Sequence, residues 1–299
     1  MLALLLALAS PELNVRGVAI SYGNTVLENA YRNGVEILRR AGKRVTLAIG
    51  ARRPLKRALA VALETHGESG LGFAAVPPAG VVLDFVRPLD RLLAEQDEPV
   101  TLVTLGPLTG LALALRRDRD LVRAKVARHL AMAGSLDAPG NTTPYSEFNA
   151  WCDPEALDAV LRAELPTELV GLDVTRRFVL SGEDVARLGQ VDAPLARWVH
   201  DALRCYLDFH RQYEGLDGCV INDVLPVAEL LHPGGGVLSF TPLRLAVGLE
   251  DGDQRGRTKV HPEGARVAVA TDVRTEPVRA MLLERVLPWL AGSLIGGAT

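Results

Sequence analysis

A polar stretch in the middle of the chain has the residue types needed to hold a ligand with several hydroxyl groups. Residues 140–155 read GNTTPYSEFNAWCDPE, in which Asn141 and Asn149 bracket Glu147. Amide and carboxylate side chains among Thr, Ser and Pro favour a loop over the interior of a strand or helix. The stretch ends at Asp153-Pro154, a typical helix start. The alternative interpretation is an ordinary solvated loop.

The elements that must position this loop alternate between strands and helices. Short β-branched apolar runs predict buried strands, and capped amphipathic segments between them predict helices. This alternation predicts an α/β fold with a doubly wound, mostly parallel sheet flanked by helices, in a single domain over residues 1–299. The expected strands lie at 15–20, 44–49, 100–105, 129–133, 168–172, 244–249 and 265–270.

Several helix boundaries can be placed from capping residues and prolines. Helices are expected from Asp153, over 181–188 behind a Ser181 cap, and over 192–213. Residues 81–93 also have helical spacing, although a proline interrupts them. The apolar start, MLALLLALAS, is too short to span a bilayer and predicts a buried helix instead of a membrane anchor.

The polar turns of the chain follow the carboxyl ends of predicted strands. Gly23-Asn24, residues 105–107 and residues 132–149 each come directly after such a strand. In open parallel sheets this edge is where ligands bind. We therefore expect the three turns to converge on one crevice.

Composition argues against several classes of protein. The net charge of -3 and the pI near 6.1 give no basic field, so nucleic acid is not expected as a partner. Cys152, Cys205 and Cys219 have neither disulfide nor zinc spacing, which favours reduced thiols in a cytoplasmic protein. No GxGxxG follows an early strand, which disfavours a dinucleotide-binding oxidoreductase.

Five segments resemble the inosine-uridine nucleoside hydrolase family in residue types, spacing and order. The resemblance implies hydrolysis of the N-glycosidic bond of ribonucleosides to ribose and free base. It also implies a Ca²⁺ ion that holds the attacking water, and assembly into a homodimer or homotetramer. The segments are SYGNT (21–25), THGESGLG (65–72), LGPLTGLALAL (105–115), the loop of 140–156, and NDVLPVAELL (222–231).

The resemblance also implies roles for individual residues. Met132 would pack near the sugar and His66 would lie in the base pocket, with core packing and an ordinary loop histidine as the alternatives. Asp223 and the backbone carbonyl of Leu105 would bind the metal, although Asp223 could instead cap a helix. The remaining expected substrate-binding residues are Asn24, Asn141, Glu147, Asn149 and Asn222.

Two features depart from the family pattern. The family's first strand and the DTDPGxDD motif after it have no counterpart here. In the family that motif supplies the general base and two metal ligands, so we expect the base upstream of Met1. The missing strand is expected to leave a new edge in the sheet. Asp223 and one carbonyl are few ligands for an ion that takes six to eight oxygens. Asn222 stands where many members have a histidine acid, and an amide gives no proton near neutral pH. No catalytic residue is identifiable, and a degenerate, non-catalytic riboside-binding member is the alternative function.

Overall fold

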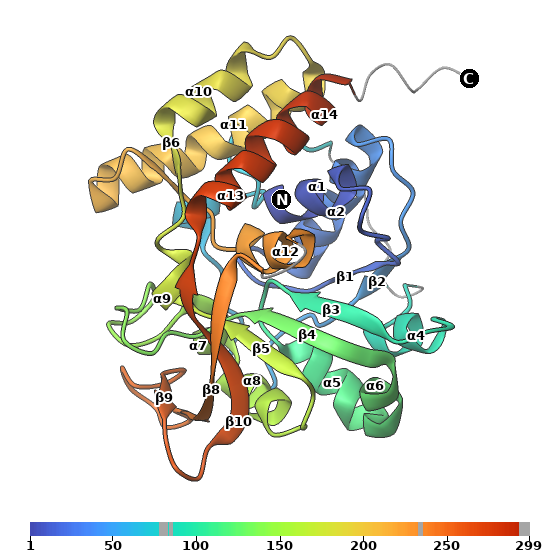
Figure 1. The fold of residues 1–299 in the computed structure, drawn as a ribbon, viewed down its shortest axis with the longest axis vertical. Helices are drawn as coiled ribbons and strands as arrows, with labels where there is room; N and C mark the ends of the chain where they lie inside the picture. The colour runs from blue at the N-terminus through green and yellow to red at the C-terminus, as the bar shows by residue number, and fades with distance from the viewer. Residues whose placement is uncertain (78–82, 84–85, 233–235, 293–299) are drawn as a thin grey trace.

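The largest sheet has six strands in the computed structural model, which describes residues 1–77, 83, 86–232 and 236–292. The strand order is β3-β4-β5-β10-β8-β9 (Figure 1). Neighbours from β3 to β10 run parallel, whereas β8 is antiparallel to both β10 and β9. The strands are β3 (Val100–Thr104), β4 (Val126–Met132), β5 (Thr167–Val170), β8 (Leu238–Val247), β9 (Thr258–Val260) and β10 (Ala265–Val273).

Two short strands near the start of the chain lie apart from this sheet. β1 (Val18–Ile20) and β2 (Leu47–Ile49) pair in parallel, and within the described residues no strand pairing joins β1 to β3. Among the described strands, β1 pairs only with β2 and β3 pairs only with β4, so each has one unpaired edge, in agreement with the expected new edge. β6 (Val179–Ser181) and β7 (Gly218–Val220) form a separate antiparallel pair. The α/β class is confirmed, with a mixed sheet whose parallel part contains β3, β4, β5 and β10.

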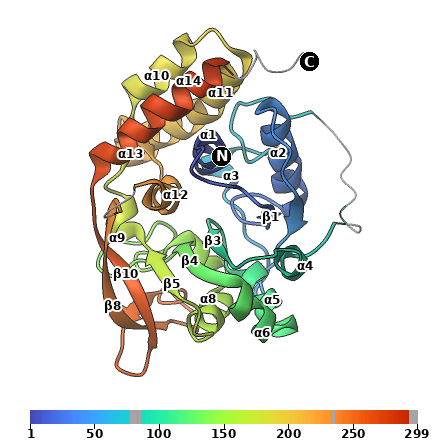
Figure 2. The same ribbon diagram turned by 45° about the vertical axis from the view of Figure 1, so that its right-hand side comes forward.

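Two hydrophobic cores cover the two faces of the six-stranded sheet. Leu169 and Val170 are consecutive residues of β5, so their side chains point to opposite faces, and each belongs to a different core. Figures 1 and 2 show helices on both faces. The Leu169 face is covered by α4 (Leu89–Ala94), α5 (Thr109–Arg117), α6 (Arg119–Lys125) and α8 (Pro154–Leu161). The Val170 face is covered by α1 (Leu2–Ala9), α9 (Leu172–Thr175) and α12 (Val224–Leu231).

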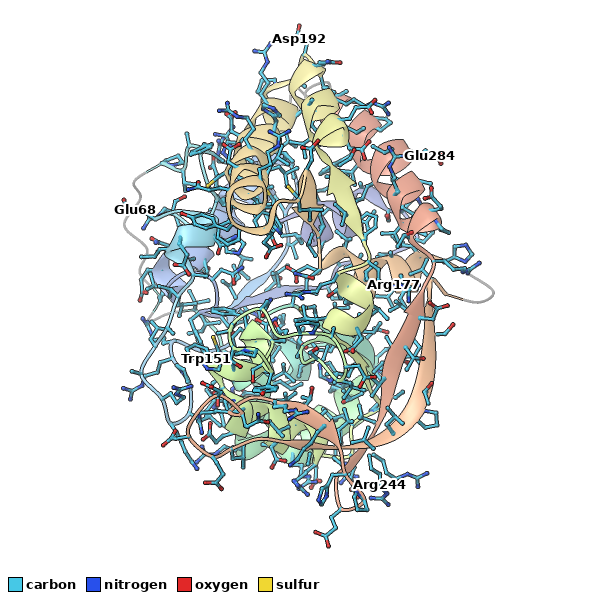
Figure 3. The ribbon with its side chains drawn as sticks, turned by 90° about the vertical axis from the view of Figure 1, so that its left-hand side faces the viewer. Glu68, Trp151, Arg177, Asp192, Arg244 and Glu284 are labelled. Atoms are coloured by element: carbon cyan, nitrogen blue, oxygen red, sulfur yellow. The ribbon has the colours of Figure 1, made fainter. Side chains whose placement is uncertain are left out.

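A group of helices stands above the Val170 face, at the end of the molecule away from β9 (Figure 1). In Figure 3, Asp192, just before this group's longest helix, and Arg244, on β8, mark the two ends of the long axis. The longest helix, α11, continues into a π-helical turn, η1 (His210–Glu214). The group comprises α10 (Gly182–Gln190), α11 (Pro194–Phe209), α13 (Thr275–Met281), η2 (Leu282–Val286) and α14 (Leu287–Gly292).

Most predicted helices are present. The apolar start forms α1, in which Leu5 and Leu6 are fully buried. Ser181 caps α10 by accepting a hydrogen bond from the Asp184 backbone N–H. None of the helices in the described ranges is long and apolar enough to span a bilayer. The three cysteines, all within the described residues, form no disulfide.

The predicted helix over 81–93 is wrong over residues 86–88, which are not helical, while its expected first residues fall partly outside the described chain. Residues 78–82 and 84–85 lie outside the described residues, and α4 begins only at Leu89. Pro88 immediately precedes this helix with an extended backbone, φ -77° and ψ 166°. Since proline disfavours helical conformation in the residue before it, the helix starts after the ring instead of running through it.

The carboxylate of Asp153 joins three segments beneath the polar loop. Its side chain is 1% exposed, and Oδ1 caps α8 by accepting from the Ala156 N–H at 3.1 Å. Oδ2 accepts from the Leu55 N–H at 2.8 Å and from the Thr109 hydroxyl at 2.6 Å. Because Thr109 donates to Asp153, the Tyr22 hydroxyl, 2.9 Å away, donates to Thr109. One carboxylate thus links segments up to 98 positions apart in sequence.

Replacing Asp153 by Ala is expected to lower the free energy of unfolding by roughly 3 kcal/mol, because buried donors lose their acceptor and α8 loses its cap. Urea unfolding measures the change. Asp158→Ala, which removes an i,i+4 pair with Arg162 on the same helix, is the matched control and should cost less than about 0.5 kcal/mol. Equal losses in the two variants would contradict the role given to Asp153.

Candidate active site

One cavity of about 500 Å³ lies where the turns after β1, β3 and β4 meet α3 (Leu63–His66), α11 and the start of α12. All nine residues singled out from the sequence line it. Trp151, labelled in Figure 3, lines it from α7 (Phe148–Cys152). The nine residues are Asn24, His66, Leu105, Met132, Asn141, Glu147, Asn149, Asn222 and Asp223.

Glu147 is held by backbone N–H groups from two segments. Its Oε1 accepts from Asn149 at 2.8 Å, and its Oε2 accepts from Ala150 and from Gly134, each at 3.0 Å. The first two bonds cap α7, and the third fixes the turn after β4. Only 2% of Glu147 is exposed. Burial raises the pKa of its carboxyl to about 7, although the three hydrogen bonds act in the opposite direction and lower it.

The segment around Glu147 is also anchored to the region just before and at β9. The hydroxyl of Thr258 accepts from the Ser135 N–H at 2.9 Å and donates to the Ser135 carbonyl at 2.7 Å. Ser146 donates to the Arg255 carbonyl at 2.6 Å. The Arg255 guanidinium, nearly buried, binds both oxygens of Glu155 at 2.6 and 2.7 Å. These contacts fix the loop at both ends.

Asn149 and Asn141 take up different positions. The Asn149 amide nitrogen donates to the Met132 carbonyl at 3.0 Å and lies 3.4 Å from its sulfur, so α7 is tied to the end of β4. Met132 is 2% exposed and therefore serves core packing as well as lining the cavity. Asn141 is exposed, and its oxygen accepts from the Phe148 N–H at 2.8 Å. This bond orients its amide at the cavity wall.

Asn222 and Asp223 precede α12 and face the cavity. Asp223 is the cap residue of α12, but its side chain makes no capping hydrogen bond, so the simple capping role is wrong. Removal from water raises the pKa of Asp223 to about 6. The side-chain oxygen of Asn222 is buried with no hydrogen-bond partner in the described structure. A buried polar atom without a partner beside a cavity is free to accept from a ligand.

The donor set for a Ca²⁺ ion is incomplete within the described part of the chain. Asp223 brings one carboxylate and Leu105 one carbonyl to the cavity. The described residues contain no group of three or more His, Cys, Asp or Glu side chains that could hold a metal. Ca²⁺ takes six to eight oxygen ligands, so these residues alone do not fit a complete calcium site.

His66 lies in the cavity wall against an aromatic ring. Its imidazole stacks on Tyr206 of α11, with 5.3 Å between ring centroids and 26° between ring planes. Burial lowers the pKa of His66 to about 4, so the ring is neutral at neutral pH. His66 is therefore a buried, stacked ring in the cavity wall and not a solvated loop histidine, and its place in a base pocket stays a prediction.

Sequence reasoning missed a row of cavity residues on α11 and η1. Tyr206, His210 and Glu214 are four positions apart and, with Phe209, line the cavity. His210 lies at no motif-like spacing from the other histidines of the chain. The signal that could have found it is the i,i+4 relation to Tyr206 and Glu214, which places three side chains on one side of a helix.

Glu147→Gln is expected to change how stability depends on pH. Since the pKa of Glu147 is raised from 4.5 to about 7 in the folded state, its contribution to stability is complete below about pH 4.5 and is lost as the pH rises to about 7. Glutamine removes this titration. Relative to wild type, the variant's free energy of unfolding should rise by roughly 2 kcal/mol between pH 5 and pH 7.

Urea unfolding of both proteins at the two pH values measures the difference. Glu250→Gln, at an exposed loop position, is the control and should follow the wild type at both pH values. A constant difference between Glu147→Gln and wild type across this range would contradict the prediction.

Comparison with known proteins agrees with the resemblance seen in the sequence. The model of the inosine-uridine preferring nucleoside hydrolase family matches residues 1–280. The pyrimidine-specific ribonucleoside hydrolase RihA of Photobacterium profundum is 36% identical over 254 residues, covering 83% of this chain and 80% of that protein. RihA of an Enterobacter species is 38% identical over 254 residues, covering 83% and 79%.

A solved structure shows the same fold. The purine-preferring ribonucleoside hydrolase from Gardnerella vaginalis superposes with a TM-score of 0.88 at 24% identity, covering 97% of this chain and 95% of the other. The expectation drawn from the five motifs is confirmed. By homology the chain is a nucleoside hydrolase, and it belongs to the inosine-uridine preferring nucleoside hydrolase family.

Proposed function

We propose that this nucleoside hydrolase cleaves the N-glycosidic bond of pyrimidine ribonucleosides to ribose and free base. The observation that carries the proposal is the single cavity that gathers all nine predicted residues from separate parts of the chain. The preference for pyrimidines is supported by the relatives at 36–38% identity, which are pyrimidine-specific.

The polar residues of the cavity suit a ribose. Asn24, Asn141 and Asn149 bring amide groups, and Glu147 brings a carboxylate whose position is fixed by backbone N–H groups. Side chains held in place before binding lose little freedom when they grip a sugar. Binding energy from the ribose hydroxyls is then available for distorting the sugar toward the transition state.

The carboxylates suit the charge that develops during cleavage. Breaking a glycosidic bond gives the sugar oxocarbenium character, which carries positive charge. Glu147 and Asp223 both line the cavity, and burial raises the pKa of each carboxyl. The negative charge of Asp223 raises the pKa of Glu147 further. Because these carboxyl groups are removed from water, their ionised forms are costly when no cation is near. For the same reason, each carboxylate interacts strongly with a positive charge that develops beside it.

The calcium requirement that the resemblance implies belongs to the same proposal. Asp223 and the Leu105 carbonyl are the residues here that would contact the ion. With so few donors, we expect this 299-residue chain to hold Ca²⁺ weakly.

The first experiment is ribose release from uridine, cytidine and inosine by this chain, with added Ca²⁺ and with a chelator. Uridine and cytidine should be cleaved faster than inosine, and the chelator should abolish turnover. Faster cleavage of inosine would overturn the pyrimidine preference. Riboside binding without ribose release would establish the non-catalytic alternative.

Asp223→Asn is expected to lower kcat for uridine by roughly 100-fold, because the side chain keeps its size and loses the negative charge that would contact the ion and stabilise the charge on the sugar. Steady-state kinetics of ribose release measure the change, with Asp158→Asn on α8 as a control outside the cavity. An unchanged kcat would show that the Asp223 carboxylate does not act in the reaction.

A further inference from the structure

The row on α11 and η1 ends in a histidine–carboxylate pair that the reaction described above does not yet use. His210 is 3% exposed, and its Nε2 lies 3.7 Å from Oε2 of Glu214. The Glu214 side chain is 45% exposed. The pair therefore connects the cavity wall to solvent.

The hydrogen bonding of His210 fixes which ring nitrogen is available. Its Nδ1 lies 2.8 Å from the backbone carbonyl of Tyr206. Because a carbonyl only accepts, Nδ1 must carry the proton of that bond. Nε2, on the Glu214 side, is then the nitrogen that gains and gives a proton.

The Tyr206 ring holds the two histidines of the cavity in place. His210 contacts it edge-on, with 4.3 Å between centroids and 81° between planes, whereas His66 stacks on it. The Tyr206 hydroxyl donates to the Val220 carbonyl at 3.1 Å, which prevents the ring from turning freely. His210 thus has a defined orientation before any ligand binds.

The uncharged groups of the cavity are poorly suited to protonate a leaving base. Asn222 is an amide and has no proton to give near neutral pH. His66 is already neutral there, since burial lowers its pKa to about 4. Burial also raises the pKa of the Tyr206 phenol well above its usual range, and its proton is engaged with Val220.

The carboxyl groups that line the cavity are also poor candidates for the acid that protonates the base. Both oxygens of Glu147 accept backbone N–H groups, and Asp223 is assigned above to the charge on the sugar. Glu64, on α3, is exposed to solvent. Among the side chains of the described residues that line the cavity, His210 is the histidine whose ring nitrogen lies within 4 Å of a carboxylate, at 3.7 Å from Glu214.

Resting on the hydrolase function proposed above, we propose that His210, oriented by the Tyr206 carbonyl and paired with Glu214, is the general acid that protonates the departing nucleobase. The bond between C1′ and the base nitrogen breaks, and its electron pair leaves with the base. The base takes the proton of His210 Nε2. The water oxygen bonds to C1′, and the proton that it releases restores His210 through solvent and Glu214.

The test compares two leaving groups. Uracil needs a proton to depart, whereas the nitrophenolate of p-nitrophenyl β-D-ribofuranoside departs as a stable anion. His210→Gln should lower kcat for uridine by roughly 100-fold and kcat for the nitrophenyl riboside by less than about threefold. Glu214→Gln, at an exposed position that tolerates change, should lower kcat for uridine by roughly tenfold with the same selectivity.

The matched control is His200→Gln, on the same helix and outside the cavity lining. It should leave both rates unchanged. Equal loss on both substrates in His210→Gln and in Glu214→Gln would indicate a structural role and overturn the proposal, as would an unchanged rate on uridine. A wild-type protein that cleaves no riboside would instead overturn the hydrolase function and the acid together.

Discussion

The arrangement of the cavity depends on a single buried carboxylate. Glu147 accepts backbone N–H groups from the turn after β4 and from the first turn of α7, so it holds two segments at a fixed separation. Burying a carboxylate is costly, and three charge-assisted hydrogen bonds offset much of that cost. Met132 and Asn149 belong to the segments that Glu147 joins, and the Asn149 amide reinforces the junction by donating to the Met132 carbonyl.

The two sides of the proposed reaction are served by different parts of the fold. Amides and carboxylates come from strand ends, α7 and the start of α12, where parallel strands present their carboxyl edge. Rings come from α3 and α11, which close the cavity from the helical side. Because sugar-binding residues and base-side residues lie on different elements, residues on α11 can be substituted to suit another base without changing the residues that bind the sugar.

The parts of the site that could be predicted from sequence carry local signals. A polar turn directly after an apolar strand locates Asn24 or Asn141 whatever the rest of the chain does, and Asp153-Pro154 marks its own helix. His210 gave no such signal, because one histidine on a long helix has the same local pattern whether it faces a core, a cavity or solvent. The π-helical turn that positions Glu214 leaves no trace in hydrophobic spacing either. The helix expected through Pro88 does not run through it, because the proline, and not the helical spacing of apolar residues, decides where α4 begins.

The anchoring of Ser135 by Thr258 bears on the order in which the protein is made and folded. The two residues are 123 positions apart, and the loop cannot gain this support until the later one has been synthesised. The neighbouring pair β3–β4 needs no such wait, since its strands lie close in sequence. On the ribosome, the parallel strands β3, β4 and β5 can therefore pair while the cavity loop is still unanchored, whereas β10 is made only after Thr258. The cavity loop can gain its Thr258 anchor only once β9 has been made, after most of the other cavity-lining segments.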